Sequence, residues 1–148
     1  YGGRSLLFNI SGSSQKQSIR EAWNNKAQGY MSSPVVIDGH IYLHLRNRRA
    51  CCIDVATGET RWTTKPFGKY WSMVANSKQI LALDERGELL LIAANPNKFE
   101  LIDRKQVSEQ STWAHLAVCG NQVFVRDIAG LSVYRWHSPA GQKAKLDR

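Results

Sequence analysis

Long apolar runs are missing from the sequence, which has no stretch of about 18 or more apolar residues of the kind that a membrane-spanning helix requires. Cysteine is scarce as well. There are three, Cys51, Cys52 and Cys119, and an odd number with one adjacent pair does not predict a disulfide framework. Because neighbouring residues of a strand point to opposite faces, Cys51 and Cys52 are not expected to meet. We expect Cys52 to be a small core residue.

Motifs that carry common chemistries are also absent. There is no glycine-rich phosphate loop, no paired-cysteine metal box, no His-Glu-x-x-His motif and no Gly-x-Ser-x-Gly elbow. Four histidines are scattered without hairpin or helical spacing to a carboxylate: His40, His44, His115 and His137. For His44 and His115 we expect a core or channel-wall position with a hydrogen-bonded ring nitrogen. Three aspartates lie in predicted turns, which account for them: Asp38, Asp84 and Asp127.

What the chain does have is positive charge, with 20 lysines and arginines against 12 acidic residues and a net charge of +8. The basic residues concentrate in residues 46–49 and 143–148. Such clusters can bind nucleic acid or another anionic surface, but they also occur in solvated turns and tails. No aromatic residue alternates with these arginines to stack on bases, so we predict no nucleic-acid partner. Residues 137–148 are predicted to be a disordered, polar and basic tail.

The chain also contains a repeat. Residues 33–62 are predicted to form four short strands, joined by turns such as Asp38-Gly39. The segment Tyr-Leu-His-Leu at 42–45 aligns with Ile-Leu-Ala-Leu at 80–83, an offset of 38 (80 − 42), and its start aligns with 123–125, an offset of 81 (123 − 42). A period of about 40–50 residues with alternating apolar positions predicts four-stranded propeller blades rather than helical repeats.

We therefore predict an all-β fold of consecutive four-stranded antiparallel blades, about three blades plus part of another. The predicted domain covers residues 1–136, with blades at 1–23 (partial), 33–62, 71–103 and 113–136. Trp71 and Trp113 are predicted to begin innermost strands, where they either face the channel and a ligand or pack between blades. Both interpretations stay open.

Residues 52–62, Cys-Ile-Asp-Val-Ala-Thr-Gly-Glu-Thr-Arg-Trp, resemble the Ala-x-Asp-x-x-Thr-Gly-x-x-x-Trp signature of the PQQ-like (quinoprotein) β-propeller repeat. Cys52 replaces the alanine, and the second copy lacks the aspartate, the Thr-Gly and the tryptophan. The resemblance implies that the tryptophan of one blade docks against a turn of its neighbour. It assigns this structural docking to Asp54, Thr57, Gly58 and Trp62, and Trp23 is the corresponding tryptophan of the preceding blade.

A propeller of this type has about seven or eight blades, more than 148 residues supply. The sequence is thus expected to be a C-terminal part of a longer protein, or else two or more copies close a ring. Expected partners are the remaining blades of the same propeller or other proteins, with self-association possible through open blade edges.

A repeat without a catalytic constellation favours a non-catalytic binding or scaffolding propeller, similar to the outer-membrane barrel-assembly scaffold lipoprotein family. By this resemblance we expect a periplasmic or exported location. One alternative is part of a periplasmic PQQ-dependent dehydrogenase, which would need calcium, PQQ and an aspartate base; no residue of this chain can be assigned to such a site. Another alternative is a sensor propeller attached to a kinase or protease.

Overall fold

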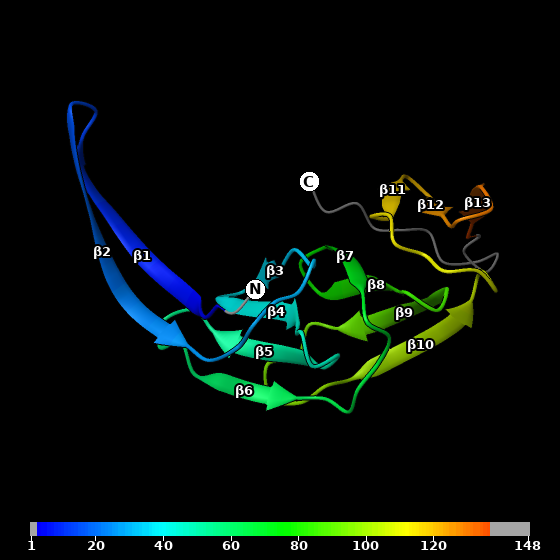
Figure 1. Ribbon diagram of the computed structural model, residues 1–148, viewed down its shortest axis with the longest axis horizontal. Helices are drawn as coiled ribbons and strands as arrows, with labels where there is room; N and C mark the ends of the chain where they lie inside the picture. The colour runs from blue at the N-terminus through cyan, green and yellow to red at the C-terminus, as the bar shows by residue number, and fades with distance from the viewer. Residues whose placement is uncertain (1–2, 137–148) are drawn as a thin grey trace, which may run out of the picture.

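The computed structural model describes residues 3–136, and within them the chain forms thirteen strands and no helix (Figure 1). The strands build four antiparallel sheets, two of which have the full four strands. This confirms the predicted all-β architecture of consecutive antiparallel blades. No helix in this range is long and apolar enough to cross a membrane. The predicted tail at 137–148, with His137, lies outside the described residues.

The first sheet is a long hairpin of β1 (Ser5–Ser13) and β2 (Lys16–Asn25). It projects away from the other sheets in Figure 1. Most of its side chains are exposed because two strands alone cannot cover a face. Exposed apolar residues alternate along it, including Phe8 and Ile10.

The second sheet is a complete blade with the strand order β3-β4-β5-β6. Its strands are β3 (Val35–Ile37), β4 (His40–His44), β5 (Ala50–Asp54) and β6 (Thr60–Thr63). Asp38 and Gly39, between β3 and β4, have φ angles of 46° and 72°. Two consecutive positive φ angles are what a tight two-residue hairpin turn requires, and Asp-Gly is a favoured pair for it.

The third sheet repeats this order as β7-β8-β9-β10. It consists of β7 (Trp71–Ala75), β8 (Gln79–Asp84), β9 (Glu88–Ala93) and β10 (Leu101–Gln106). Figure 1 shows the two complete blades next to each other, and their first strands, β3 and β7, are in contact.

The last sheet has three strands, β11 (Ala117–Cys119), β12 (Gln122–Arg126) and β13 (Leu131–Arg135). The prediction that Trp113 begins its innermost strand is wrong, because β11 starts only at Ala117. The preceding backbone bonds to the neighbouring blade instead: Leu116 N donates to Ser72 Oγ at 3.2 Å. Trp113 therefore lies in the link between two blades.

The core lies between the sheets, so the inner strands are buried on both faces. Cys52 packs in the cluster between the two complete blades, with Tyr42 and Leu90. Cys51 points to the opposite face and packs with Leu43 near the hairpin. Both thiols are free, and burial raises the pKa of Cys51 to about 12 and that of Cys52 to about 11. Such thiols are inert packing groups rather than nucleophiles.

Candidate interaction site

Trp23 joins the hairpin to the first complete blade. Its Nε1 donates to the carbonyl oxygen of Val55 at 2.7 Å, and its ring packs with the cluster around Cys51. The ring lies directly over Gly58, where a built Cβ would come within 2.5 Å of Trp23 Cδ2. Gly58 also has a φ of +75°, so both its backbone conformation and the space above it favour glycine.

Asp54 and Thr57 shape the turn on which Trp23 rests. Asp54 Oδ1 accepts hydrogen bonds from the backbone N–H groups of Ala56 at 2.9 Å and Thr57 at 3.0 Å. Thr57 Oγ1 in turn accepts from Glu59 N at 3.2 Å. The hydrogen bonds that Thr57 and Ala56 donate to this carboxylate lower its pKa. The three signature residues Asp54, Thr57 and Gly58 thus form a turn that presents the Val55 carbonyl to Trp23.

Trp62 makes the same kind of contact one blade further on. Its Nε1 donates to the carbonyl oxygen of Asn95 at 2.9 Å, in the β9–β10 connection. Its ring meets Phe99 edge-on, with centroids 5.7 Å apart, and Tyr42 at 6.0 Å. The accepting turn has neither the aspartate nor the Thr-Gly. Asn95 Oδ1 instead accepts from Asn97 N at 2.9 Å, which forms an Asx turn in place of the Thr-Gly turn.

Replacing Gly58 with alanine is expected to cost more stability than the same change at Gly39. The two glycines have similar φ angles, +75° and +72°, but nothing lies within 4 Å of a Cβ built at Gly39. Gly39→Ala should therefore report the backbone cost alone, about 1–2 kcal/mol. Gly58→Ala should lose about 1–3 kcal/mol more because the methyl group displaces the Trp23 ring. Urea unfolding followed by circular dichroism measures both losses, and equal losses would contradict the contact with Trp23.

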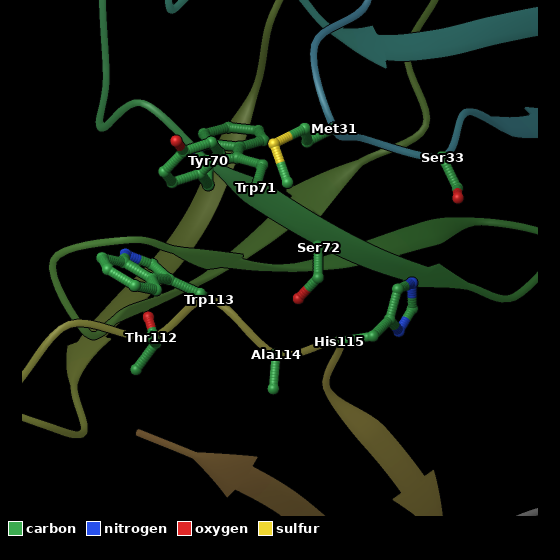
Figure 2. A pocket seen from close by; sticks show the side chains of 9 residues that line it. All are labelled: Met31, Ser33, Tyr70, Trp71, Ser72, Thr112, Trp113, Ala114 and His115. Atoms are coloured by element: carbon green, nitrogen blue, oxygen red, sulfur yellow. The ribbon is translucent and has the colours of Figure 1, made fainter. Parts of the chain in front are cut away.

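Beside the complete blades, at the beginning of β7, lies a groove of about 380 Å³ with aromatic walls (Figure 2). Three inter-blade segments meet there, and the groove is lined by Met31, Ser33, Tyr70, Trp71, Ser72, Thr112, Trp113, Ala114 and His115. Tyr30 stacks on Tyr70 with ring centroids 5.8 Å apart, and Trp113 meets Tyr70 edge-on at 6.3 Å. Met31 is 74% exposed and Trp113 is 68% exposed.

The floor of the groove is rigid because Asp84 ties several segments together. Its buried carboxylate accepts from Gly68 N at 2.6 Å, Trp71 Nε1 at 2.8 Å and Arg86 N at 2.9 Å. Its backbone oxygen accepts from Thr112 Oγ1 at 2.6 Å. Only the bond from Arg86 belongs to the turn predicted from the sequence. The others fix the loops that carry the groove.

Of the two tryptophans predicted as possible channel residues, Trp71 is therefore buried in the floor and Trp113 is exposed in the wall. Trp71 stacks on His44, with centroids 5.0 Å apart and an interplanar angle of 14°. It also packs against Phe67 at 4.7 Å.

His44 is fully buried, as expected for a core position. Among residues 3–136 no partner meets standard hydrogen-bond geometry at Nδ1 or Nε2, although the carbonyls of Arg48 and Gly68 lie near the ring. Burial lowers the pKa of His44 to about 4, and the nearby Asp84 carboxylate and the carbonyls of Arg48 and Gly68 offset only part of this effect. The ring is held by stacking. His115, in contrast, is exposed, and its Nδ1 lies 2.9 Å from the Leu116 oxygen.

The site has the properties of a binding surface. In the part of the chain that the structure describes, no three His, Cys, Asp or Glu residues are grouped so that they could hold a metal ion. What the groove offers is exposed aromatic and thioether surface on a rigid floor, with Ser33, Ser72 and His115 as polar groups. Such surfaces bind large apolar side chains of a partner.

Comparisons with known proteins agree with this architecture. The family model described as Outer membrane protein assembly factor BamB matches residues 2–64, which include the signature at 52–62. No curated protein matches the chain. The β-propeller domain of Cps50 (Swd1) from Myceliophteria thermophila aligns with a TM-score of 0.67 and 13% identity, over 91% of this chain and 50% of that one.

BamB from Moraxella catarrhalis aligns with a TM-score of 0.63 and 14% identity, over 91% of this chain and 43% of that one. The computationally designed protein Ika8 aligns with a TM-score of 0.59 and 9% identity, over 88% of this chain and 45% of that one. The chain thus spans half or less of the length of these structures. Its fold is that of β-propeller blades, as predicted from the repeat, and the matching family model agrees with the resemblance of residues 52–62 to the PQQ-like signature.

Proposed function

We propose that this protein is a non-catalytic binding propeller that holds a segment of a partner protein in the groove at the beginning of β7. The observation that carries the proposal is the exposure of Met31 and Trp113 on a floor fixed by Asp84. An exposed aromatic cluster of this kind costs solubility unless a partner covers it. The BamB description of the matching family model and the propeller neighbours support a scaffolding role.

Blade docking is part of the same proposal. Trp23 and Trp62, with Asp54, Thr57 and Gly58, keep neighbouring blades in a fixed relation, so that the links between blades form one surface. The remaining blades of the propeller would be supplied by further sequence or by another chain. An exported or periplasmic location is also proposed, and the description of the family model supports it.

The proposal predicts that peptides selected on this protein bind through Trp113. A phage-displayed library of random peptides of about 12 residues is selected on the protein, and the enriched peptides are synthesised. Trp113→Ser should weaken their binding about 10-fold or more, because it removes the largest exposed ring of the wall. Ile128→Ser is the matched control, since Ile128 is similarly exposed, at 67%, but does not line the groove.

Isothermal titration calorimetry with the wild type and the two variants gives the dissociation constants. Equal affinity of the wild type and Trp113→Ser, or no enrichment above an unrelated protein, would contradict the proposed function.

A further inference from the structure

A second, charged hollow lies next to the aromatic groove. It has a volume of about 400 Å³, and its charged lining residues are Arg48, Lys69, Glu85, Arg86 and Glu109. Lys69 connects the two hollows, because its Nζ lies 5.2 Å from the ring centroid of Tyr70 and 5.9 Å from that of Tyr30. At these distances the ammonium group makes cation–π contacts with both rings, so Lys69 lies on the boundary between the aromatic groove and the charged hollow.

Positive charge dominates this end of the blades. We define the basic rim as Arg46, Arg48, Lys69 and Arg86. Arg46 N donates to the oxygen of Gln28 at 2.7 Å, which brings the turn before β5 to the link that carries the groove. The structure shows three ion pairs among residues 3–136, and none of them includes a member of the rim.

The hollow has two carboxylates, those of Glu85 and Glu109, and the Glu85 carboxylate already accepts a hydrogen bond. Glu85 Oε2 accepts a hydrogen bond from the backbone N of Lys69 at 2.5 Å. Glu109 is exposed and also lines the hollow. The rim therefore keeps an excess of cations without acidic partners, and its charge is available to a bound molecule.

The backbone gives an independent indication at the same place. Met31 and Arg48 have φ angles of 46° and 67°, in the left-handed region that favours glycine or asparagine. Among residues 3–136 the third non-glycine residue with a positive φ is Asp38, which lies in a hairpin turn where aspartate is common. Arg48 also lies in a hairpin turn, between β4 and β5, but both it and Met31 carry long side chains in a backbone conformation that is unfavourable for residues with a Cβ. Strained residues of this kind concentrate at functional sites.

We infer that the aromatic groove and the basic rim together bind an extended, acidic protein segment with an aromatic or large aliphatic side chain. This inference rests on the proposed function and adds the chemistry of the partner. The apolar side chain enters the groove between Met31, Tyr70 and Trp113, while neighbouring carboxylates meet Arg48 and Lys69. Nucleic acid is the other polyanion that could meet these cations, and the test below distinguishes it from an acidic peptide.

The test uses three fluorescein-labelled peptides of about 12 residues that differ only in charge. Each alternates phenylalanine with a second residue type, which is glutamate, serine or lysine. Fluorescence anisotropy gives the dissociation constants at about 50 mM and about 500 mM NaCl. The glutamate peptide should bind at least about 10-fold more tightly than the lysine peptide, and this difference should shrink at high salt.

Variants assign the binding to the rim. The double variant Arg48→Ser, Lys69→Ser should weaken the glutamate peptide about 10-fold and leave the serine peptide unchanged. Lys16→Ser is the charge control, because Lys16 lies at the exposed tip of the hairpin. All three side chains are exposed, so the fold is kept.

Three results would overturn the inference, and they separate it from the proposed function. Equal, Trp113-dependent binding of all three peptides would refute the acidic partner but leave the binding propeller intact. Binding of the glutamate peptide that is unchanged by the double variant would refute the basic rim. Tighter, rim-dependent binding of a labelled thymidine oligonucleotide of about 12 nucleotides would assign the surface to nucleic acid instead.

Discussion

Replacing Trp62 with alanine is expected to lower the free energy of unfolding by about 3–5 kcal/mol, as for other large-to-small changes of a packed aromatic residue. The change removes the ring that fills the space between Tyr42 and Phe99. It also leaves the carbonyl oxygen of Asn95 without the indole donor. Urea denaturation followed by far-ultraviolet circular dichroism measures the loss of unfolding free energy. Circular dichroism is used in place of tryptophan fluorescence because the variant lacks one tryptophan.

Two controls separate packing from hydrogen bonding. Trp62→Phe retains most of the ring area but loses Nε1, so it should cost only about 1–2 kcal/mol. Trp113→Ala removes a tryptophan that is 68% exposed and should cost less than about 1 kcal/mol. A similar loss for Trp62→Ala and Trp113→Ala would show that the contact between the blades contributes little to stability.

Acid is expected to destabilise the protein through His44, by about 3 kcal/mol between pH 6.5 and pH 4. Burial lowers the pKa of His44 from 6.5 to about 4 in the folded protein, so in this window the unfolded chain binds a proton that the folded protein does not. Stability therefore rises with pH through the window and is lost as pH falls. Above pH 6.5 both states are neutral and the effect disappears.

His44→Phe is the matched variant, since a phenyl ring can keep the stack on Trp71 but cannot be protonated. The stability of this variant should change much less between pH 6.5 and 4. Asp54 and Asp127 also have lowered pKa values, but their contribution is lost below their ordinary pKa of 3.8, outside the window. Parallel curves of unfolding free energy against pH for both proteins would rule out His44 as the cause.

Much of the fold could be predicted because it depends on short-range patterns. Alternating apolar residues and the Asp38-Gly39 turn specify local strands and hairpins, and the repeat at offsets of 38 and 81 indicates that the same unit recurs. Trp113 was placed wrongly in a strand for the same reason. Its apolar neighbours fit the alternation, but the nearby Ser72 hydroxyl takes the backbone N–H of Leu116.

The candidate site was largely beyond sequence reasoning. Tyr30, Tyr70 and Trp113 are separated by some forty residues each, and nothing local indicates that their rings meet. Basic residues such as those at 46–49 also occur in solvated turns, and nothing local distinguishes such a turn from a binding surface. Residues 69–71, Lys-Tyr-Trp, are a basic and aromatic cluster at the start of a predicted strand, and this was the one signal in the sequence. It indicates a binding site only when the links at 30–33 and 112–115 are known to lie beside it.

By itself the sequence determined that the chain forms propeller blades and that Trp23 and Trp62 are suited to dock between them, because strand alternation and turn chemistry act within a few residues. Only the tertiary structure decided that Asn95 receives Trp62 without the signature, that the buried His44 stacks on Trp71, and that an aromatic groove lies beside a basic rim. These features depend on how successive blades rotate against each other. That rotation is set by packing across sheet faces, which joins residues far apart in the chain.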